Sequence, residues 1–314
     1  MCTAITLQSV NDHAFFARTM DLPTTTPWRP IYLPAGFLWQ PSTDNSGKPL
    51  PMAILGGGRW TPGNHYLMGD AMNEAGLACA ELYFPVEAHY ASSMVNGKLN
   101  ITPQDFIYWA LTHHSIAELR LDLPNINIVA QKWYSENNWR PFHWLLTDVA
   151  GNTAILEPRG HGLTLTEAPL HVLTNTPNYP AHIVRLAKTL GIDPKSSVDA
   201  FKQACRSFDG ELRHTNLPTD RFQRSVINLW RQNVPQTSLA AEQQLLTLLD
   251  DVVIPRTPER LRRSNMDYTH YEDVLDLTER TMTFKSVRTG EIHHLRLDDI
   301  KTDSPQQVVA YPFT

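Results

Sequence analysis

The first 22 residues of the chain, MCTAITLQSVNDHAFFARTMDL, contain two apolar runs separated by a short polar segment. Residues 4–7 (AITL) and 14–20 (AFFARTM) have the composition of β-strands, and residues 9–12 (SVND) are typical of a turn. A β-hairpin that folds back at this turn places Cys2 opposite residues 19–21, because the turn fixes the register of the two strands. The start of the chain is therefore expected to lie inside a sheet.

Two charged residues on the returning strand, Arg18 and Asp21, are expected to flank Cys2. Successive side chains of a strand point to opposite faces, so a spacing of three separates Arg18 from Asp21. Asp21 must then lie past the end of the strand or at a bulge to reach the same site. This is a geometric requirement that a structure can test.

The rest of the chain predicts an α+β protein. Strand-like segments separated by turns occur in residues 66–84, 126–175 and 266–298, whereas residues 181–251 have the periodicity of helices. We expect a single domain over residues 1–314, with sheets packed together and helices outside. The Gly56–Gly58 run lacks the spacing of a phosphate-binding loop and favours a bend at a strand end.

Composition limits the classes of partner. The net charge is -5, and the sequence has neither a Lys/Arg-rich block nor an apolar run of the ~20 residues that a membrane span needs. We therefore expect a small-molecule substrate, no nucleic acid and no membrane. The first residues do not resemble a secretory signal, and three widely spaced cysteines do not suggest a disulfide framework. A cytoplasmic protein is expected.

A cysteine at position 2 has a special chemical property. Removal of Met1 would leave a thiol and an α-amine on one residue, and the mature chain would then start at Cys2. The pKa of a free α-amine is about 7.7–8.0 in short peptides, so a useful fraction is neutral near neutral pH. Such an amine can take the thiol proton and later protonate a leaving amine. A nearby Arg18 favours the thiolate.

Several motifs together resemble the choloylglycine hydrolase family, which contains the bile salt hydrolases and penicillin V acylases. They run from residue 2 to about residue 285, in the order and at roughly the spacing of that family. The motifs are MCTAIT (1–6), FFARTMD (15–21), GDAMNEAGL (69–77), LYF (82–84), LTDVAGNTAILEP (146–158), HVLTNTPNY (171–179), DRFQR (220–224) and DYTHY (267–271). The resemblance implies the αββα four-layer sandwich of N-terminal-nucleophile hydrolases.

The resemblance also implies roles for individual residues. Cys2 corresponds to the nucleophile with its amine as base, Arg18 to the cation near the thiol, and Asp21 to the carboxylate that holds the amine. Asn175 corresponds to the side-chain donor of an oxyanion hole. Arg221 corresponds to a second cation. Arg224, three residues further on, is expected as its neighbour.

Tyr83 bears on the substrate. Bile salt hydrolases of this pattern usually carry Asn at this position, whereas penicillin V acylases carry Tyr. Tyr83 would offer its backbone N–H to the oxyanion and its ring to an aromatic acyl group. Thr19 likewise matches the acylases. The segment 217–221 (LPTDR) is shorter than in relatives and lacks their Gly. In relatives this segment helps to shape the substrate pocket and the contacts of the usual homotetramer, so the substrate specificity and the homo-oligomeric state expected from the resemblance both depend on it.

We therefore predict a hydrolase of linear amides that acts on penicillin V-like compounds and requires no metal or cofactor. A bile salt hydrolase, an acylase of N-acyl amino acids or of acyl-homoserine lactones, and a non-catalytic binder on the same fold are the alternatives. The roles of loops 22–62 and 130–142 do not follow from the pattern.

Overall fold

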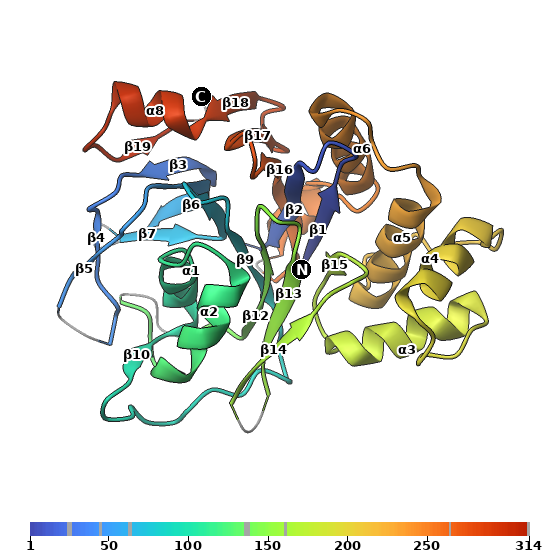
Figure 1. The fold of residues 1–314 in the computed structure, drawn as a ribbon, viewed down its shortest axis with the longest axis horizontal. Coiled ribbons are helices and arrows are strands. Elements are labelled where there is room, and N and C mark those ends of the chain that lie inside the picture. Colours follow the sequence, from blue (N-terminus) through green and yellow to red (C-terminus); the bar gives the residue numbers. More distant parts are fainter. Residues whose placement is uncertain are drawn as a thin grey trace.

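The computed structural model describes residues 1–23, 27–43, 46–61, 65–134, 139–159, 162–263 and 265–312. Within these residues most strands belong to two large sheets (Figure 1). One sheet has the strand order β15 (Val172–Leu173), β1 (Cys2–Gln8), β2 (Ala14–Leu22), β16 (Tyr268–Asp276), β17 (Thr281–Ser286) and β18 (Ile292–Arg296). We call it the N-terminal sheet.

The second sheet is formed mainly by the first half of the chain. Its strand order is β14 (Leu163–Glu167), β13 (Thr153–Pro158), β12 (Phe142–Thr147), β9 (Ala78–Tyr83), β8 (Asp70–Asn73), β6 (Ile54–Thr61), β3 (Arg29–Leu33) and β19 (Val309–Ala310), and β7 (His65–Met68) also pairs with β6. Two small ribbons pair β4 (Leu38–Trp39) with β5 (Lys48–Pro49) and β10 (Leu99–Ile101) with β11 (Ile126–Ile128). We call the sheet that runs from β14 to β19, together with β7, the second sheet.

Helices cover the outer faces of both sheets (Figure 1). Four pack on the side of the N-terminal sheet: α3 (Tyr179–Leu190), α4 (Val198–Ser207), α5 (Pro218–Arg231) and α6 (Ser238–Asp250). The second sheet is covered by α1 (Phe106–Ala110) and α2 (Ile116–Asp122), which follow the short 3-10 helix η1 (Pro103–Asp105) and precede η2 (Leu123–Asn125). The short helices α7 (Pro258–Arg262) and α8 (Leu297–Asp303) lie near the C-terminal strands. This layering confirms the predicted α+β fold of the αββα type.

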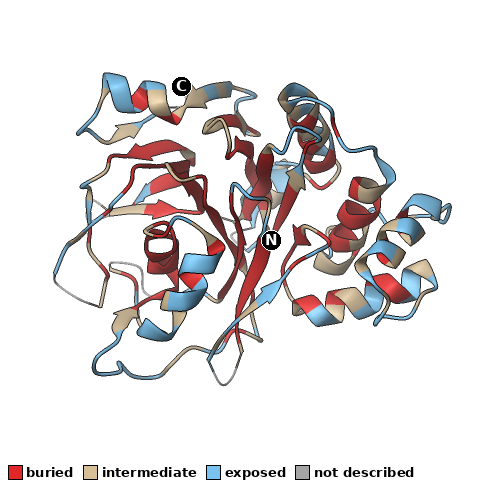
Figure 2. Cartoon of the chain, viewed as in Figure 1, coloured by how far each residue is buried: buried red, intermediate tan, exposed pale blue. Residues whose placement is uncertain are grey.

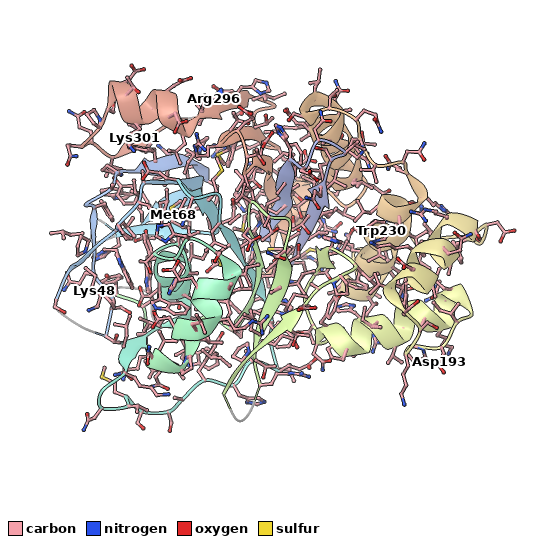
Figure 3. All side chains as sticks on the ribbon, in the orientation of Figure 1. Lys48, Met68, Asp193, Trp230, Arg296 and Lys301 are labelled. Carbon is pink, nitrogen blue, oxygen red and sulfur yellow. The ribbon has the colours of Figure 1, made fainter. Side chains whose placement is uncertain are left out.

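The hydrophobic core has two parts, one between the sheets and toward α3–α6, the other between the second sheet and α1–α2. Both hairpin strands β1 and β2 are buried along nearly their whole length (Figure 2). Charged side chains such as Asp193 and Lys301 lie at the periphery, whereas Met68 lies inside (Figure 3). No helix among the described residues is both long and apolar enough to cross a membrane.

The glycine run does not form the expected bend at a strand end. Gly56, Gly57 and Gly58 lie inside β6, where neighbouring chains approach closely. A Cβ added to Gly57 would lie 2.3 Å from the hydroxyl oxygen of Tyr271, and one added to Gly56 would lie 2.1 Å from the Asp70 carbonyl oxygen. Gly57 therefore leaves room for Tyr271 of the N-terminal sheet, and Gly56 leaves room for the adjacent strand β8 of its own sheet.

Candidate active site

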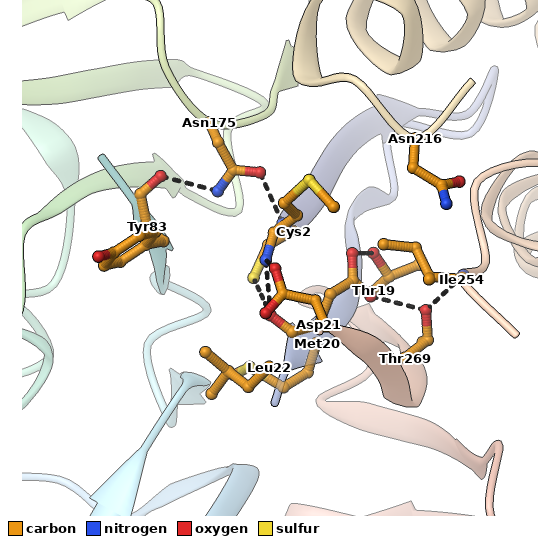
Figure 4. A network of polar contacts seen from close by, with 12 residues as sticks. Cys2, Thr19, Met20, Asp21, Leu22, Tyr83, Asn175, Asn216, Ile254 and Thr269 are labelled. Carbon is orange, nitrogen blue, oxygen red and sulfur yellow. Dashed lines mark hydrogen bonds and ion pairs between the residues drawn. The ribbon is translucent and has the colours of Figure 1, made fainter. Parts of the chain in front are cut away.

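Cys2 lies at the start of β1, in the register that the hairpin turn predicts. It pairs with Met20, and only 3% of its surface is exposed. Its Sγ lies 3.9 Å from the Asp21 carbonyl oxygen, and its backbone N–H donates to Asn175 Oδ1 at 2.7 Å (Figure 4). Its carbonyl oxygen accepts from Arg221 Nη1 at 2.6 Å. Segments from three distant parts of the chain therefore meet at Cys2.

Strand alternation divides the residues around Cys2 between the two faces of the sheet. Cross-strand pairing places Cys2 and Arg18 on the face toward the second sheet, and Asp21 on the helix-covered face. The register between β2 and β16 shifts beside Asp21, but the extra residue lies on β16. Asp21 itself lies inside β2, so its side chain stays on the face opposite Arg18, and the expected bulge or strand end at Asp21 is not found. Arg18 and Asp21 therefore approach Cys2 from opposite sides.

Arg18 is fully buried between the sheets. Its Nη1 donates to the Gly69 carbonyl at 2.5 Å and lies 3.6 Å from Asp70 Oδ1, which also accepts a hydrogen bond from the Tyr271 hydroxyl. Burial opposes the charge of Arg18, but the nearby Cys2 thiol, Tyr271 and Asp70 outweigh it and raise the pKa of Arg18. Arg18 therefore remains a cation beside the thiol.

Asp21 contacts the start of the chain through its backbone, a detail that side-chain reasoning did not anticipate. Its carboxylate accepts hydrogen bonds from Thr269 Oγ1 at 2.7 Å and from Thr19 Oγ1 at 3.3 Å. Burial raises the pKa of Asp21, and the terminal amine and Arg221 oppose that rise. The backbone carbonyl of Asp21 accepts a hydrogen bond from the Met1 amine at 2.8 Å and so makes the direct contact with the start of the chain.

Asn175 and Arg221 lie in direct contact with Cys2 and with each other. Arg221, which is fully buried on α5, donates from Nη2 to Asn175 Oδ1 at 2.7 Å and from Nη1 to Thr3 Oγ1 at 2.5 Å. Asn175 Oδ1 thus accepts from both Cys2 and Arg221, while Nδ2 donates to the Tyr83 carbonyl at 2.8 Å. The amide of Asn175 is fixed at both of its ends.

Tyr83 reaches the site through its backbone. Its ring packs against the part of the core between the second sheet and α1–α2, rather than between the sheets. Phe84 donates to the Pro141 carbonyl, and Glu81 donates away from β12 to the Gly69 carbonyl. Because backbone groups alternate in direction along a strand, the N–H and C=O of Tyr83 point to the same side as the N–H of Glu81. The N–H of Tyr83 therefore points toward Asn175.

Arg224 does not join the residues around Cys2. Its Nε pairs with Asp251 Oδ2 at 2.8 Å, and Nη1 donates to the Arg213 carbonyl at 2.7 Å. These contacts tie the segment before α5 to the end of α6. Arg224 therefore supports the helix that carries Arg221.

The terminal amine of Met1 has two partners. It donates to the Asp21 carbonyl and to Asp267 Oδ2, the latter at 2.5 Å. Asp267 was not singled out from the sequence, and neither were Thr269 and Tyr271. All three fall within the DYTHY motif, so that motif carried a signal that residue types alone did not reveal.

The segments whose roles the sequence left open contribute to one cavity. Residues 37–40, 65–66 and 133–134 line a space of about 240 Å³ together with Asp105 and Tyr108. Most of these side chains are aromatic, and the rings of His65 and Tyr134 stack 3.4 Å apart. Within the described residues, no group of three or more His, Cys, Asp or Glu side chains is arranged to hold a metal ion.

Comparisons with known proteins agree on the family. The sequence profile of the linear amide C–N hydrolases of the choloylglycine hydrolase family matches residues 2–310. The chain is 25% identical to the bile salt hydrolase/transferase of Clostridium perfringens, over 96% of this chain and 94% of that protein. It is 26% identical to the bile salt hydrolase/transferase of Lactiplantibacillus plantarum, over 99% and 97%.

Solved structures confirm the fold. A variant of the conjugated bile acid hydrolase of Clostridium perfringens superposes with a TM-score of 0.83 at 23% identity, covering 100% of this chain and 97% of that chain. The penicillin V acylase of Agrobacterium tumefaciens superposes with a TM-score of 0.74 at 19% identity, covering 98% and 90%. The profile match over nearly the whole chain, together with this fold, shows that the protein belongs to the choloylglycine hydrolase family of linear amide C–N hydrolases.

Proposed function

We propose that Cys2, once Met1 is removed, hydrolyses the linear amide bond of a small N-acyl compound as an N-terminal nucleophile. The observation that carries this proposal is the contact of Cys2 N with Asn175 Oδ1 at 2.7 Å, with Sγ of the same residue beside Asp21. Nucleophile and base would then lie on one residue that contacts three partners, Asn175, Asp21 and Arg221. A passive binding protein has no need of that arrangement.

In the proposed reaction, the neutral α-amine of Cys2 accepts the thiol proton, and the thiolate attacks the amide carbonyl. Arg18 stabilises the thiolate from between the sheets. The ammonium then protonates the leaving amine, and an S-acyl enzyme remains. Water, deprotonated by the same amine, hydrolyses this thioester and regenerates the thiol.

The charge that develops on the carbonyl oxygen requires donors. Asn175 Nδ2 carries two N–H groups, and one donates to the Tyr83 carbonyl, which leaves the second for the substrate oxygen. The backbone N–H of Tyr83, which points to the same side, supplies the other donor. Removing one such donor typically lowers the rate by about 10²–10³-fold.

For the acyl group, two substrate classes compete. The bile salt hydrolases among the relatives favour a conjugated bile acid. Tyr83, which replaces the Asn usual in bile salt hydrolases of this pattern, matches the penicillin V acylases in sequence. Its ring packs in the layer of α1–α2, so the expected contact of this ring with an aromatic acyl group is not supported, and the argument rests on the sequence match alone. Parallel measurement of kcat/KM for glycocholate and penicillin V decides between them. A clear preference for glycocholate would overturn the argument from Tyr83.

The role of Cys2 can be tested separately from the substrate. We expect wild-type protein to lack Met1 by intact mass and to hydrolyse a linear amide, and Cys2→Ser to be processed and folded but to lose turnover. Cys79→Ser, which changes a buried thiol outside the site, is the matched control and should keep turnover. Undiminished hydrolysis by Cys2→Ser would refute the proposal.

A further inference from the structure

Two buried histidines contact the backbone on either side of Asn175. His143 on β12 donates from Nε2 to the Thr174 carbonyl at 2.8 Å, and His182 on α3 donates from Nε2 to the Asn175 carbonyl at 2.9 Å. Neither imidazole is more than 1% exposed. The roles given above to Cys2, Arg18, Asp21 and Asn175 do not use either histidine.

These two carbonyls belong to the peptide planes that precede and follow the Asn175 Cα. Because each peptide unit is planar, the orientation of the side chain of Asn175 depends on the two rotations between those planes. One hydrogen bond to each plane restrains both rotations. The histidines therefore restrain the direction of the Asn175 Cα–Cβ bond, from which the amide extends, although neither contacts the amide.

Each imidazole is itself held by an aromatic ring next to a residue that Asn175 contacts. The His143 ring stacks on Phe84 with centroids 4.2 Å apart and an interplanar angle of 7°, and Phe84 follows Tyr83. The His182 ring stacks on Phe222 at 4.5 Å, and Phe222 follows Arg221. The Nδ2 end of the Asn175 amide is thus linked to His143, and the Oδ1 end to His182.

The second ring nitrogen of each histidine, Nδ1, is buried without a hydrogen-bond partner among the described residues. His143 Nδ1 lies 3.6 Å from Glu157 Oε1, and the same carboxylate oxygen accepts the Tyr179 N–H at the start of α3. Glu157 thus lies between His143 and the helix that carries His182. Burial lowers the pKa of His182 to about 4, so its single proton at neutral pH resides on Nε2, the nitrogen that faces the carbonyl.

We propose that His143 and His182 are positioning residues of the oxyanion hole, which fix the backbone of Asn175 so that its amide meets the transition state. This rests on the proposed function of Cys2. Their loss should lower kcat rather than raise KM, because the donor they orient acts on charge that develops only in the transition state.

The test replaces each histidine by Leu, which removes the donor, and by Gln, whose amide nitrogen can take the place of Nε2. We expect each Leu variant to lose at least about tenfold in kcat, with KM within about threefold of wild type, and each Gln variant to recover most of kcat. The matched control is His113, which is also buried and bonded to backbone carbonyls, but in the layer of α1 and α2. His113→Leu should keep kcat.

Folded, Met1-free Leu variants with unchanged kcat would overturn the proposal, and so would a loss of kcat that Gln fails to recover. If a Leu variant does not fold, Asn takes its place, since its shorter side chain is polar but does not reach the carbonyl, and the same two outcomes apply. Failure of the underlying function is distinguishable. In that case Cys2→Ser would retain turnover whatever the histidine variants do.

Discussion

Replacing Asn175 by Asp separates the two tasks that its amide performs in the structure. Asp keeps an oxygen where Oδ1 accepts from Cys2 N and Arg221 Nη2, both at 2.7 Å. It removes Nδ2, which donates to the Tyr83 carbonyl and is proposed to donate to the substrate oxygen. The hydrogen bond from Cys2 N to residue 175 should therefore remain, whereas the hydrogen bond that stabilises the oxyanion should be lost.

The magnitude follows from the lost donor. We expect kcat for amide hydrolysis to fall about 10²–10³-fold, which corresponds to about 2.7–4 kcal/mol of transition-state stabilisation. Alkylation of Cys2 by iodoacetamide forms no oxyanion, so its rate should stay within about threefold of wild type. Asn175→Ala should lose both activities and also stability, because it leaves the N–H of Cys2 and the guanidinium of Arg221 without their acceptor.

The assay compares steady-state hydrolysis with the second-order rate constant of alkylation, for protein whose Met1 removal has been verified by mass. A kcat for Asn175→Asp within about tenfold of wild type would refute the assignment of Asn175 to the oxyanion hole, because loss of one donor should exceed that factor. A matching fall in the alkylation rate would instead show that Asp disturbs Cys2 itself.

Three further predictions follow from other contacts. Thr269→Val removes the 2.7 Å hydrogen bond to Asp21 and leaves a buried carboxylate oxygen without that donor. We expect the free energy of unfolding, measured in urea, to fall by about 1–3 kcal/mol, and Thr269→Ser, which keeps the hydroxyl, to restore it. Gly57→Ala places a Cβ 2.3 Å from the Tyr271 hydroxyl and should cost about 1–3 kcal/mol of stability in the same assay, whereas unchanged stability would show that the sheets separate easily. Burial lowers the pKa of His270 to about 4, so below pH about 6.5 the unfolded chain binds a proton at this residue that the folded chain does not. The free energy of unfolding should therefore fall as the pH is lowered from about 6.5 toward 4, by roughly 2 kcal/mol between pH 7 and 4.5. His270→Gln should reduce this pH dependence by that amount, and an unaltered slope would contradict the argument.

The sequence allowed the hairpin and its register to be predicted, because strand periodicity and a short turn are local properties. Cys2 lies opposite Met20 as expected, but Asp21 lies inside the regular strand β2, and the bulge beside it belongs to β16. The capping of α2 by Ser115, which accepts from the Glu118 N–H three residues on, also depends only on nearby residues. Elements set by short-range chemistry were therefore predictable.

Contacts through backbone carbonyls were not predictable. The resemblance implied a backbone N–H role for Tyr83, but the carbonyl contacts of Asp21 and Tyr83 do not follow from a pattern that assigns chemistry to side chains. Arg224 lies one helical turn from Arg221, yet its partner is Asp251, because the end of α6 packs beside it. Such choices depend on which elements meet in space.

The same limit applies to His143. It is 32 positions from Asn175 along the chain, on a strand of the other sheet, and its partner is a peptide carbonyl. No local spacing connects such residues. Only the packing of the second sheet against the N-terminal sheet brings them together.

The ion pair between the amine of Met1 and Asp267 has a practical consequence for any measurement on this protein. While Met1 is attached, the nitrogen of Cys2 belongs to a peptide bond that donates to Asn175, so it cannot act as the base. A pure, well-folded sample can then contain inert and competent chains side by side. Turnover numbers should therefore be calculated from the concentration of titrated active sites rather than from the total amount of protein.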